Sequence, residues 1–151
     1  MMQPQRPSRR TGLLEDQFWN HLEQHKLHLQ RCADCVHLWY PPGPVCPHCL
    51  SQRWQWEPMS GRGRVASWTV FHRQYFTQMP PPYVVVVAEL EEGPLIVADL
   101  ESTETQSLQI GAPVNLRFLE VYTDDTAWWN YQWKLASKTS TSEASSVLEI
   151  L

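Results

Sequence analysis

Two cysteine pairs constrain the fold of this chain more than any other feature of its sequence. Cys32 and Cys35 form the first C-x2-C pair, and Cys46 and Cys49 form the second, with ten residues between the pairs. The two-residue gap lets both thiolates of a pair point at one ion, and two such pairs close a tetrahedral site with no open position. The sequence therefore predicts one structural zinc ion per chain on these four cysteines, with iron or two disulfides as the alternatives.

The segment around the cysteines, residues 27–57, is predicted to form a zinc ribbon. Four prolines lie within residues 38–47 and exclude a helix there. A segment with so few apolar residues needs a cross-link to stabilise its fold, and the metal ion supplies one. His37 and His48 lie beside the cysteines and could replace one of them as a ligand, but we favour four thiolates with both histidines on the surface.

An amphipathic helix is predicted ahead of the ribbon, over residues 13–26. Leu14, Phe18 and Leu22 recur every four residues and form one apolar stripe. A helix with a single apolar stripe needs a partner to cover it, so we expect this stripe to pack on the rest of the protein.

Both ends of the chain are polar. Residues 1–12 contain prolines and show no periodic pattern, so we expect a flexible N-terminus. Residues 137–151 begin with a run of Ser and Thr that offers almost nothing to bury, so we expect a disordered tail.

Five β-strands are predicted between these ends, within residues 58–136. Alternating or continuous apolar patterns mark the strands at residues 64–75, 83–90, 95–100, 114–118 and 127–135. A polar break over residues 101–109, a candidate short helix, separates the third strand from the fourth. This is the profile of a five-stranded OB-type barrel, although another five- or six-stranded β domain fits the same pattern. We expect the barrel core to include Val84, Val86, Val97, Val114, Leu116 and Phe118.

The charge balance and hydropathy exclude some classes of partner. The 151 residues include 12 Lys and Arg against 16 Asp and Glu, a formal charge of -4, whereas nucleic-acid binders usually carry a basic excess. No apolar run is long enough to span a bilayer, and no apolar region follows the N-terminal arginines. We therefore expect a cytoplasmic protein without nucleic acid or membrane as its partner.

No catalytic site of the chain's own is predicted. The metal takes all four cysteines, and neither a Gly-x-Ser-x-Gly elbow nor a phosphate-binding loop is present. His72 is a single histidine in a predicted strand, where a structural role is more common, and Asp124-Asp125 is typical of a turn. Neither feature predicts general acid or base chemistry.

The order of several short motifs resembles the DUF35 family. The resemblance covers roughly residues 14–121 and rests on six pieces: Phe18-Trp19, 27–32, Pro41-Pro42, 60–63, 82–85 and 90–93. Members of that family are acyl-CoA-associated OB-fold proteins with an N-terminal helix and a rubredoxin-like zinc ribbon. The family often has glycine directly after each cysteine pair, where this chain has Val36 and Leu50, so the turns could be rebuilt here.

What the resemblance implies is an accessory role. Family members form complexes with thiolase-like enzymes, including acyl-CoA thiolase and HMG-CoA synthase assemblies, aldolases and acyltransferases. In such complexes the partner carries the nucleophilic cysteine. The OB-fold subunit acts as a scaffold and can help hold or channel the CoA thioester.

Two groups of residues are candidate contacts in such a complex. Arginines gather in residues 53–73, and Arg62, Arg64 and Arg73 are the candidates for CoA, because guanidinium groups present forked donors to phosphate. A cluster of large aromatics near the end of the barrel is the candidate partner interface, and it comprises Trp128, Trp129, Tyr131 and Trp133. Trp128 and Trp129 face opposite sides of an alternating strand, so we expect one side to be exposed; the alternative is that Trp128 packs under the N-terminal helix or the loop of residues 80–82.

Two other functions fit parts of the sequence. Zinc ribbons and OB barrels both occur in single-stranded nucleic-acid binders, where tryptophans stack on bases. A four-cysteine ribbon holding iron would instead be a rubredoxin-like electron carrier.

Overall fold

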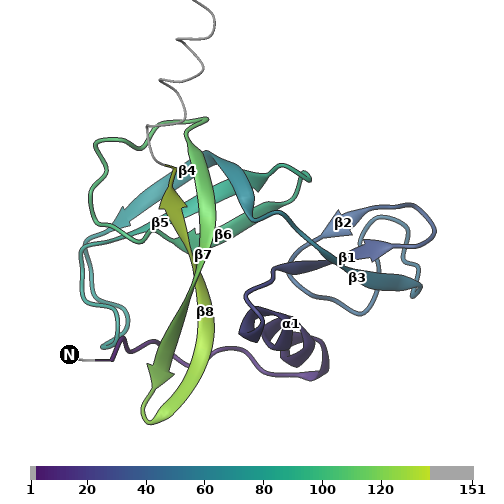
Figure 1. The fold of residues 1–151 in the computed structure, drawn as a ribbon, viewed down its shortest axis with the longest axis horizontal. Helices are drawn as coiled ribbons and strands as arrows, with labels where there is room; N and C mark the ends of the chain where they lie inside the picture. The colour runs from purple at the N-terminus through teal and green to yellow at the C-terminus, as the bar shows by residue number, and fades with distance from the viewer. Residues whose placement is uncertain (1–2, 137–151) are drawn as a thin grey trace, which may run out of the picture.

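The computed structural model describes residues 3–136, which form one helix and two β-sheets (Figure 1). The elements in chain order are α1 Leu13–Glu23, β1 His28–Cys32, β2 Leu38–Trp39, β3 Trp54–Pro58, β4 Arg62–Phe71, β5 Tyr83–Leu90, β6 Leu95–Asp99, β7 Pro113–Thr123 and β8 Thr126–Leu135. The predicted class, mostly β with an N-terminal helix and a four-cysteine ribbon, is confirmed. The tail predicted to be disordered lies outside the described residues.

The larger sheet is a barrel of five antiparallel strands in the order β6-β5-β4-β7-β8. Its two outer strands meet, because Leu100 directly after β6 pairs with Trp133 of β8. The backbone N–H of Glu101 donates to the carbonyl of Trp133 over 2.9 Å, and the Trp133 indole donates to the carbonyl of Ile96 over 3.2 Å. This contact closes the barrel and removes most of the open sheet edge.

The barrel core follows the alternation of each strand. Val84, Val86 and Val114 are buried as predicted, and Leu116 and Phe118 are half-buried against the core. The prediction is wrong for Val97, whose side chain is 47% exposed. Residues 95–98 form a continuous apolar run, which does not reveal the inward face; Ile96 and Ala98 point inward, so Val97 points outward.

The smaller sheet, in the order β2-β1-β3, carries the cysteines. Gln30 in β1 is fully buried, although its side chain is polar. Its side-chain amide donates to the carbonyl of Gly43 and accepts the Gly43 N–H, each over 2.8 Å. Because both polar ends of the amide are paired, Gln30 is stable in the interior and ties the proline-rich loop to β1.

Helix α1 lies between the smaller sheet and the barrel hairpin formed by β7 and β8 (Figure 1). Phe18 and Leu22 are buried in the main core, as the apolar stripe predicts. The helix ends at Glu23, before the predicted end at residue 26, because His25 takes a left-handed backbone conformation with φ 57°.

Residues before the helix are paired, although the sequence predicts a flexible N-terminus. Gln5 forms a bridge with Tyr122 of β7, and the N–H of Arg6 donates to the Tyr122 carbonyl over 2.9 Å. Only the start of β7 pairs with β4, so the far end of β7 has a free edge that accepts this segment.

The helices expected or excluded elsewhere in the chain can also be compared with the structure. The polar stretch 101–109 contains turns and no helix. No helix within residues 3–136 has the length and the apolar character needed to cross a membrane.

Candidate metal centre

The four cysteines converge on one point at the tip of the ribbon. Their Sγ atoms all lie within 4.8 Å of one another, with 3.5 Å between Cys32 and Cys49 and 3.6 Å between Cys35 and Cys46. Tetrahedral zinc with bonds of about 2.3 Å would separate its sulfur ligands by about 3.8 Å. All four side chains are free thiols, so the donor set and the spacing fit a zinc ion.

Two matching turns bring the sulfurs together. The N–H of Val36 donates to the carbonyl of Cys32 over 3.1 Å, and the N–H of Leu50 donates to the carbonyl of Cys46 over 2.9 Å. Val36 and Leu50 have φ values of 61° and 65°, the left-handed region that favours glycine. The turns therefore keep the conformation that glycine would adopt most easily, even though this chain has larger residues there.

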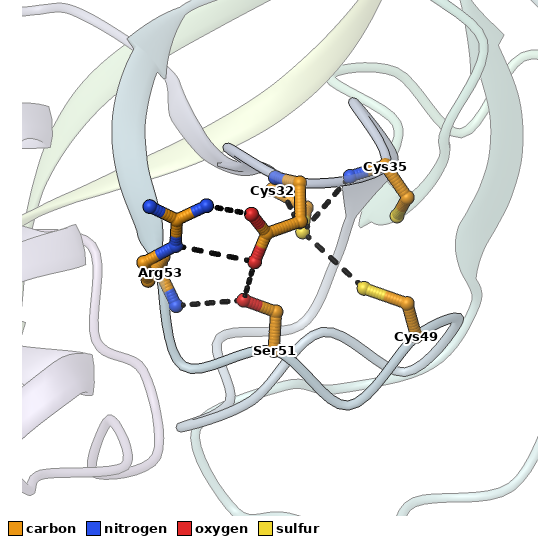
Figure 2. A network of polar contacts seen from close by, with 6 residues as sticks. Cys32, Cys35, Cys49, Ser51 and Arg53 are labelled. Carbon is orange, nitrogen blue, oxygen red and sulfur yellow. Dashed lines mark hydrogen bonds and ion pairs between the residues drawn. The ribbon is translucent and has the colours of Figure 1, made fainter.

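Backbone amides favour the thiolate at the first turn. Cys32 Sγ accepts the N–H groups of Asp34 and Cys35 over 3.4 and 3.5 Å (Figure 2). The Cys35 amide is the largest cause that lowers the pKa of the Cys32 thiol to about 6. Because the thiolate is the form that binds metal, Cys32 is the thiol of this turn that is prepared for a cation, whereas burial raises the pKa of Cys35 and of Cys49.

A polar network beside the sulfurs joins the two turns to β3 (Figure 2). The carboxylate of Asp34, inside the first cysteine pair, accepts hydrogen bonds from the Ser51 hydroxyl and the Arg53 guanidinium. The Arg53 contact, followed by that of Ser51, lowers the pKa of Asp34. No spacing rule in the sequence identifies this network, because Asp34 and the Ser51–Arg53 segment lie 17 or more residues apart in the chain.

The two neighbouring histidines lie outside the sulfur cluster. The rings of His37 and His48 stack with centroids 5.4 Å apart, and both side chains are exposed. Among the described residues, the group that could hold a metal consists of the four cysteines.

The candidate CoA arginines separate into two places. Arg62 and Arg64 line one cavity of about 490 Å³, whereas Arg73 lies beyond the end of β4, with its guanidinium 5.7 Å from the Tyr75 ring centroid. Arg62 already donates two hydrogen bonds to the carboxylate of Glu91, over 3.0 and 2.9 Å.

The candidate aromatic interface is largely interior, which corrects the prediction of an exposed cluster. Trp128, Tyr131 and Trp133 are 7%, 8% and 0% exposed. Trp129 is half-buried against His25, with ring centroids 4.2 Å apart. The physical reason is that α1 and the segment before it pack on Trp128 and Tyr131, while Trp133 lies in the barrel core.

A different apolar surface lies on the outside of the barrel, and the sequence analysis did not find it. We call it the outer sheet face; its residues are Phe71, Tyr83, Val85, Val87, Leu95 and Val97. Val87 pairs with Val97 and Phe71 with Tyr83 across neighbouring strands, so these side chains are adjacent. The sequence signal that could have revealed it is the continuous apolar run of residues 83–88, because in a strand such a run places apolar side chains on both faces of the sheet.

The ribbon and the barrel together define the class: a four-cysteine zinc ribbon joined to an OB fold. The family model described as "ChsH2, rubredoxin-like zinc ribbon domain" matches residues 19–55, and "ChsH2, C-terminal OB-fold domain" matches residues 56–119. A DUF35 domain-containing scaffold protein of Pyrococcus furiosus is 30% identical over 66% of this chain and 74% of its own length. This chain belongs to the DUF35 family.

Longer proteins and solved structures show the same likeness. A probable enoyl-CoA hydratase alpha subunit of Thermomonospora curvata is 40% identical over 70% of this chain, but the match spans only 34% of that protein. A chain of the Ltp2-ChsH2(DUF35) aldolase structure is 33% identical, with a TM-score of 0.74, over 87% of this chain and 100% of that chain. This chain thus spans about a third of the hydratase subunit and the whole of the aldolase chain.

Proposed function

We propose that this chain is a non-catalytic, zinc-containing subunit that scaffolds a thiolase-like enzyme complex acting on acyl-CoA substrates. The observation that carries the proposal is the match to a DUF35 chain of an aldolase structure, which covers 87% of this chain and 100% of that chain. Relatives named as a hydratase alpha subunit and as scaffold proteins support the same role.

One zinc ion per chain, held by Cys32, Cys35, Cys46 and Cys49, is part of this proposal. A closed set of four thiolates leaves no position for substrate, so the ion would act on folding and not on chemistry. It would hold the ribbon tip rigid, with the network of Asp34 and Arg53 beside it.

The described residues offer no cysteine outside the sulfur cluster as a nucleophile for acyl transfer. All four thiols belong to the sulfur cluster. His72 is exposed on the loop after β4, and Asp124 with Asp125 forms the turn between β7 and β8. We therefore assign the covalent chemistry to the partner enzyme.

The outer sheet face is our proposed contact with that enzyme. Leu95 and Val97 are exposed, and the neighbouring valines of β5 extend the apolar surface across two strands. Contiguous apolar surface on a small domain is typical of a protein interface, and obligate interfaces resemble a protein core. A subunit of a permanent complex would cover it.

The cavity beside Arg62 and Arg64 is our proposed place for CoA contact. Arg64 donates to the Gly111 carbonyl over 3.0 Å, and Arg62 is paired with Glu91, so a phosphate would have to displace Glu91. Arg73 lies beyond the end of β4 and does not line this cavity, so it is dropped from the set. The expected result is that Arg62→Gln raises the KM of the complex for acyl-CoA while the subunits stay associated.

The test of the scaffold role is co-purification from the native cell with a tagged copy of this chain. A thiolase-like enzyme should co-elute, and Val97→Asp should abolish its capture because a carboxylate would be buried without a partner. Ile110→Asp is the control, since Ile110 is also an exposed aliphatic residue but lies outside the outer sheet face. Full acyl-transfer activity of the captured enzyme without this chain would contradict the proposal.

Single-stranded nucleic-acid binding is less well supported. All eight tryptophans are buried or half-buried, so none offers an open stacking surface. A fluorescence titration with single-stranded DNA at low salt should show no salt-sensitive binding.

A further inference from the structure

A second cavity, of about 310 Å³, lies where α1, the loop after β2 and β8 meet. It differs from the larger cavity beside Arg62, whose guanidinium is already paired with Glu91. Three elements that are distant in the sequence build it, so its shape depends on the docking of the ribbon and the helix onto the barrel.

Aromatic rings form most of its wall. Phe18 contacts Tyr131 edge to face at 6.0 Å between centroids, and Trp19 lies 6.2 Å from the same ring. The Trp19 indole N–H is already used, because it donates to the Arg10 carbonyl over 2.8 Å. Pro42 adds a further apolar surface. The wall therefore presents flat apolar faces and few polar groups that need a hydrogen-bond partner.

One polar feature interrupts the wall, and it carries an unused proton. The hydroxyl oxygens of Tyr40 and Tyr131 lie 2.6 Å apart. Two phenols hold two protons, and the bond between them uses one. The second proton has no acceptor among the described residues, and both tyrosines line the cavity. Burial raises the pKa of both hydroxyls, so the pair remains a donor at neutral pH.

The charged residues of the cavity lining have opposite signs. Arg10 and Glu15 both line the cavity, so its lining carries one positive and one negative charge. Neither a cation nor an anion gains from such a pair, and the apolar wall would desolvate an ionic ligand at a cost.

We infer that this cavity binds a small, neutral ring compound that carries one hydrogen-bond-accepting oxygen. The ring would lie against Trp19 and Phe18, and the oxygen would accept the free proton of the Tyr40–Tyr131 pair. The size suits one ring system, since ligand sites commonly begin at about 300 Å³. This inference is independent of the scaffold role, because it concerns the chain alone.

The test is a titration of the isotope-labelled full chain with acetophenone, followed by two-dimensional NMR. Signals of the cavity residues should shift, including the Trp19 indole N–H. Ethylbenzene, a similar ring without the oxygen, should bind about tenfold more weakly, because one hydrogen bond is lost. Equal binding of the two compounds, or no shift at these residues in a saturated acetophenone solution, would overturn the inference.

A double variant isolates the hydroxyl pair. Tyr40→Phe with Tyr131→Phe removes both polar partners at once and keeps the ring shapes, which is the substitution least costly to folding. Acetophenone should then bind as weakly as ethylbenzene does, whereas Tyr75→Phe, an exposed tyrosine elsewhere, should change nothing. Unchanged acetophenone binding in the double variant would refute the assignment.

A second variant keeps the test decisive if the double variant does not fold. Glu15→Trp places a large ring in the cavity lining from the first turn of α1 and should block acetophenone, whereas Glu15→Gln should not. Equal binding in these two variants would place the compound outside this cavity and overturn the inference.

Discussion

The indole rings of Trp19 and Trp128 meet edge to face, with centroids 5.4 Å apart and planes at 76°. One ring belongs to α1 and the other to β8, so this contact joins the helix to the barrel. The Arg9 guanidinium lies within 5.8 Å of both rings, and the Trp128 N–H donates to Thr123 Oγ1 over 2.9 Å. Trp128 is therefore a structural residue of this chain.

Trp128→Ala should destabilise the protein. Removing a buried indole leaves a cavity between α1 and β8, and such truncations cost about 3 kcal/mol or more. Urea unfolding should show this loss in the free energy of unfolding, whereas Ile110→Ala, at an exposed position, should stay within about 0.5 kcal/mol of the parent. A change below about 1 kcal/mol for Trp128→Ala would mean that the contact contributes little.

Cys46→Ser should abolish zinc binding and unfold the ribbon while the barrel remains. Cys46 is fully buried, and three thiolates cannot close the tetrahedral site. Metal analysis should find one zinc per chain in the parent and none in the variant, and stoichiometric iron in the parent would instead indicate an electron carrier. His48→Ala is the control and should keep its zinc, since His48 is exposed outside the cluster.

Val36→Gly should stabilise the zinc ribbon. Val36 is 66% exposed and takes a left-handed backbone conformation, which strains a β-branched residue. The strain is about 1–3 kcal/mol and the entropic cost of glycine about 0.5–1 kcal/mol, so the net gain should be about 1 kcal/mol.

The measurement for Val36→Gly is resistance to a competing zinc chelator, together with thermal unfolding. Ala33→Gly is the matched control in the same turn, because the φ of Ala33 is not positive. It should lower stability. If both glycine variants are less stable than the parent, the strain argument is wrong.

Local patterns account for what the sequence predicts well. The cysteine spacing specifies ligands that come from two short turns, and strand alternation depends on neighbours two residues away. The metal cluster and the barrel strands therefore followed from the sequence. Val97 was assigned to the wrong face because a continuous apolar run carries no alternation.

Long-range packing accounts for what the sequence could not predict. The burial of Trp128 depends on Trp19, more than a hundred residues earlier, and the burial of Gln30 depends on the backbone of Gly43. The Tyr40–Tyr131 pair joins the ribbon to the barrel in the same way. No periodicity within one segment reports such contacts, so the aromatic cluster looked like an interface until the docking of α1 was known.

The stability of the protein should fall on mild acidification because of two stacked histidines. His21 of α1 and His28 of β1 lie with ring centroids 3.8 Å apart. Burial is the largest cause that lowers the pKa of both, and the positive charge of Lys26 adds to the effect at His21. In the unfolded chain each imidazole titrates near its ordinary pKa of about 6.5.

The direction of this pH dependence follows from proton binding. As the pH falls through about 6.5, these two histidines bind protons in the unfolded chain but not yet in the folded protein, so the free energy of unfolding decreases. Above that range both states are neutral at these positions and the full stability is retained.

Urea unfolding at pH 7.5 and 5.5 should show the loss for the parent and a smaller loss for the variant carrying His21→Gln and His28→Gln. Acid also protonates metal-bound thiolates, but that effect is common to both proteins, and the exposed His72→Gln should behave like the parent. An identical pH dependence in the double variant and the parent would show that the stacked pair does not control it.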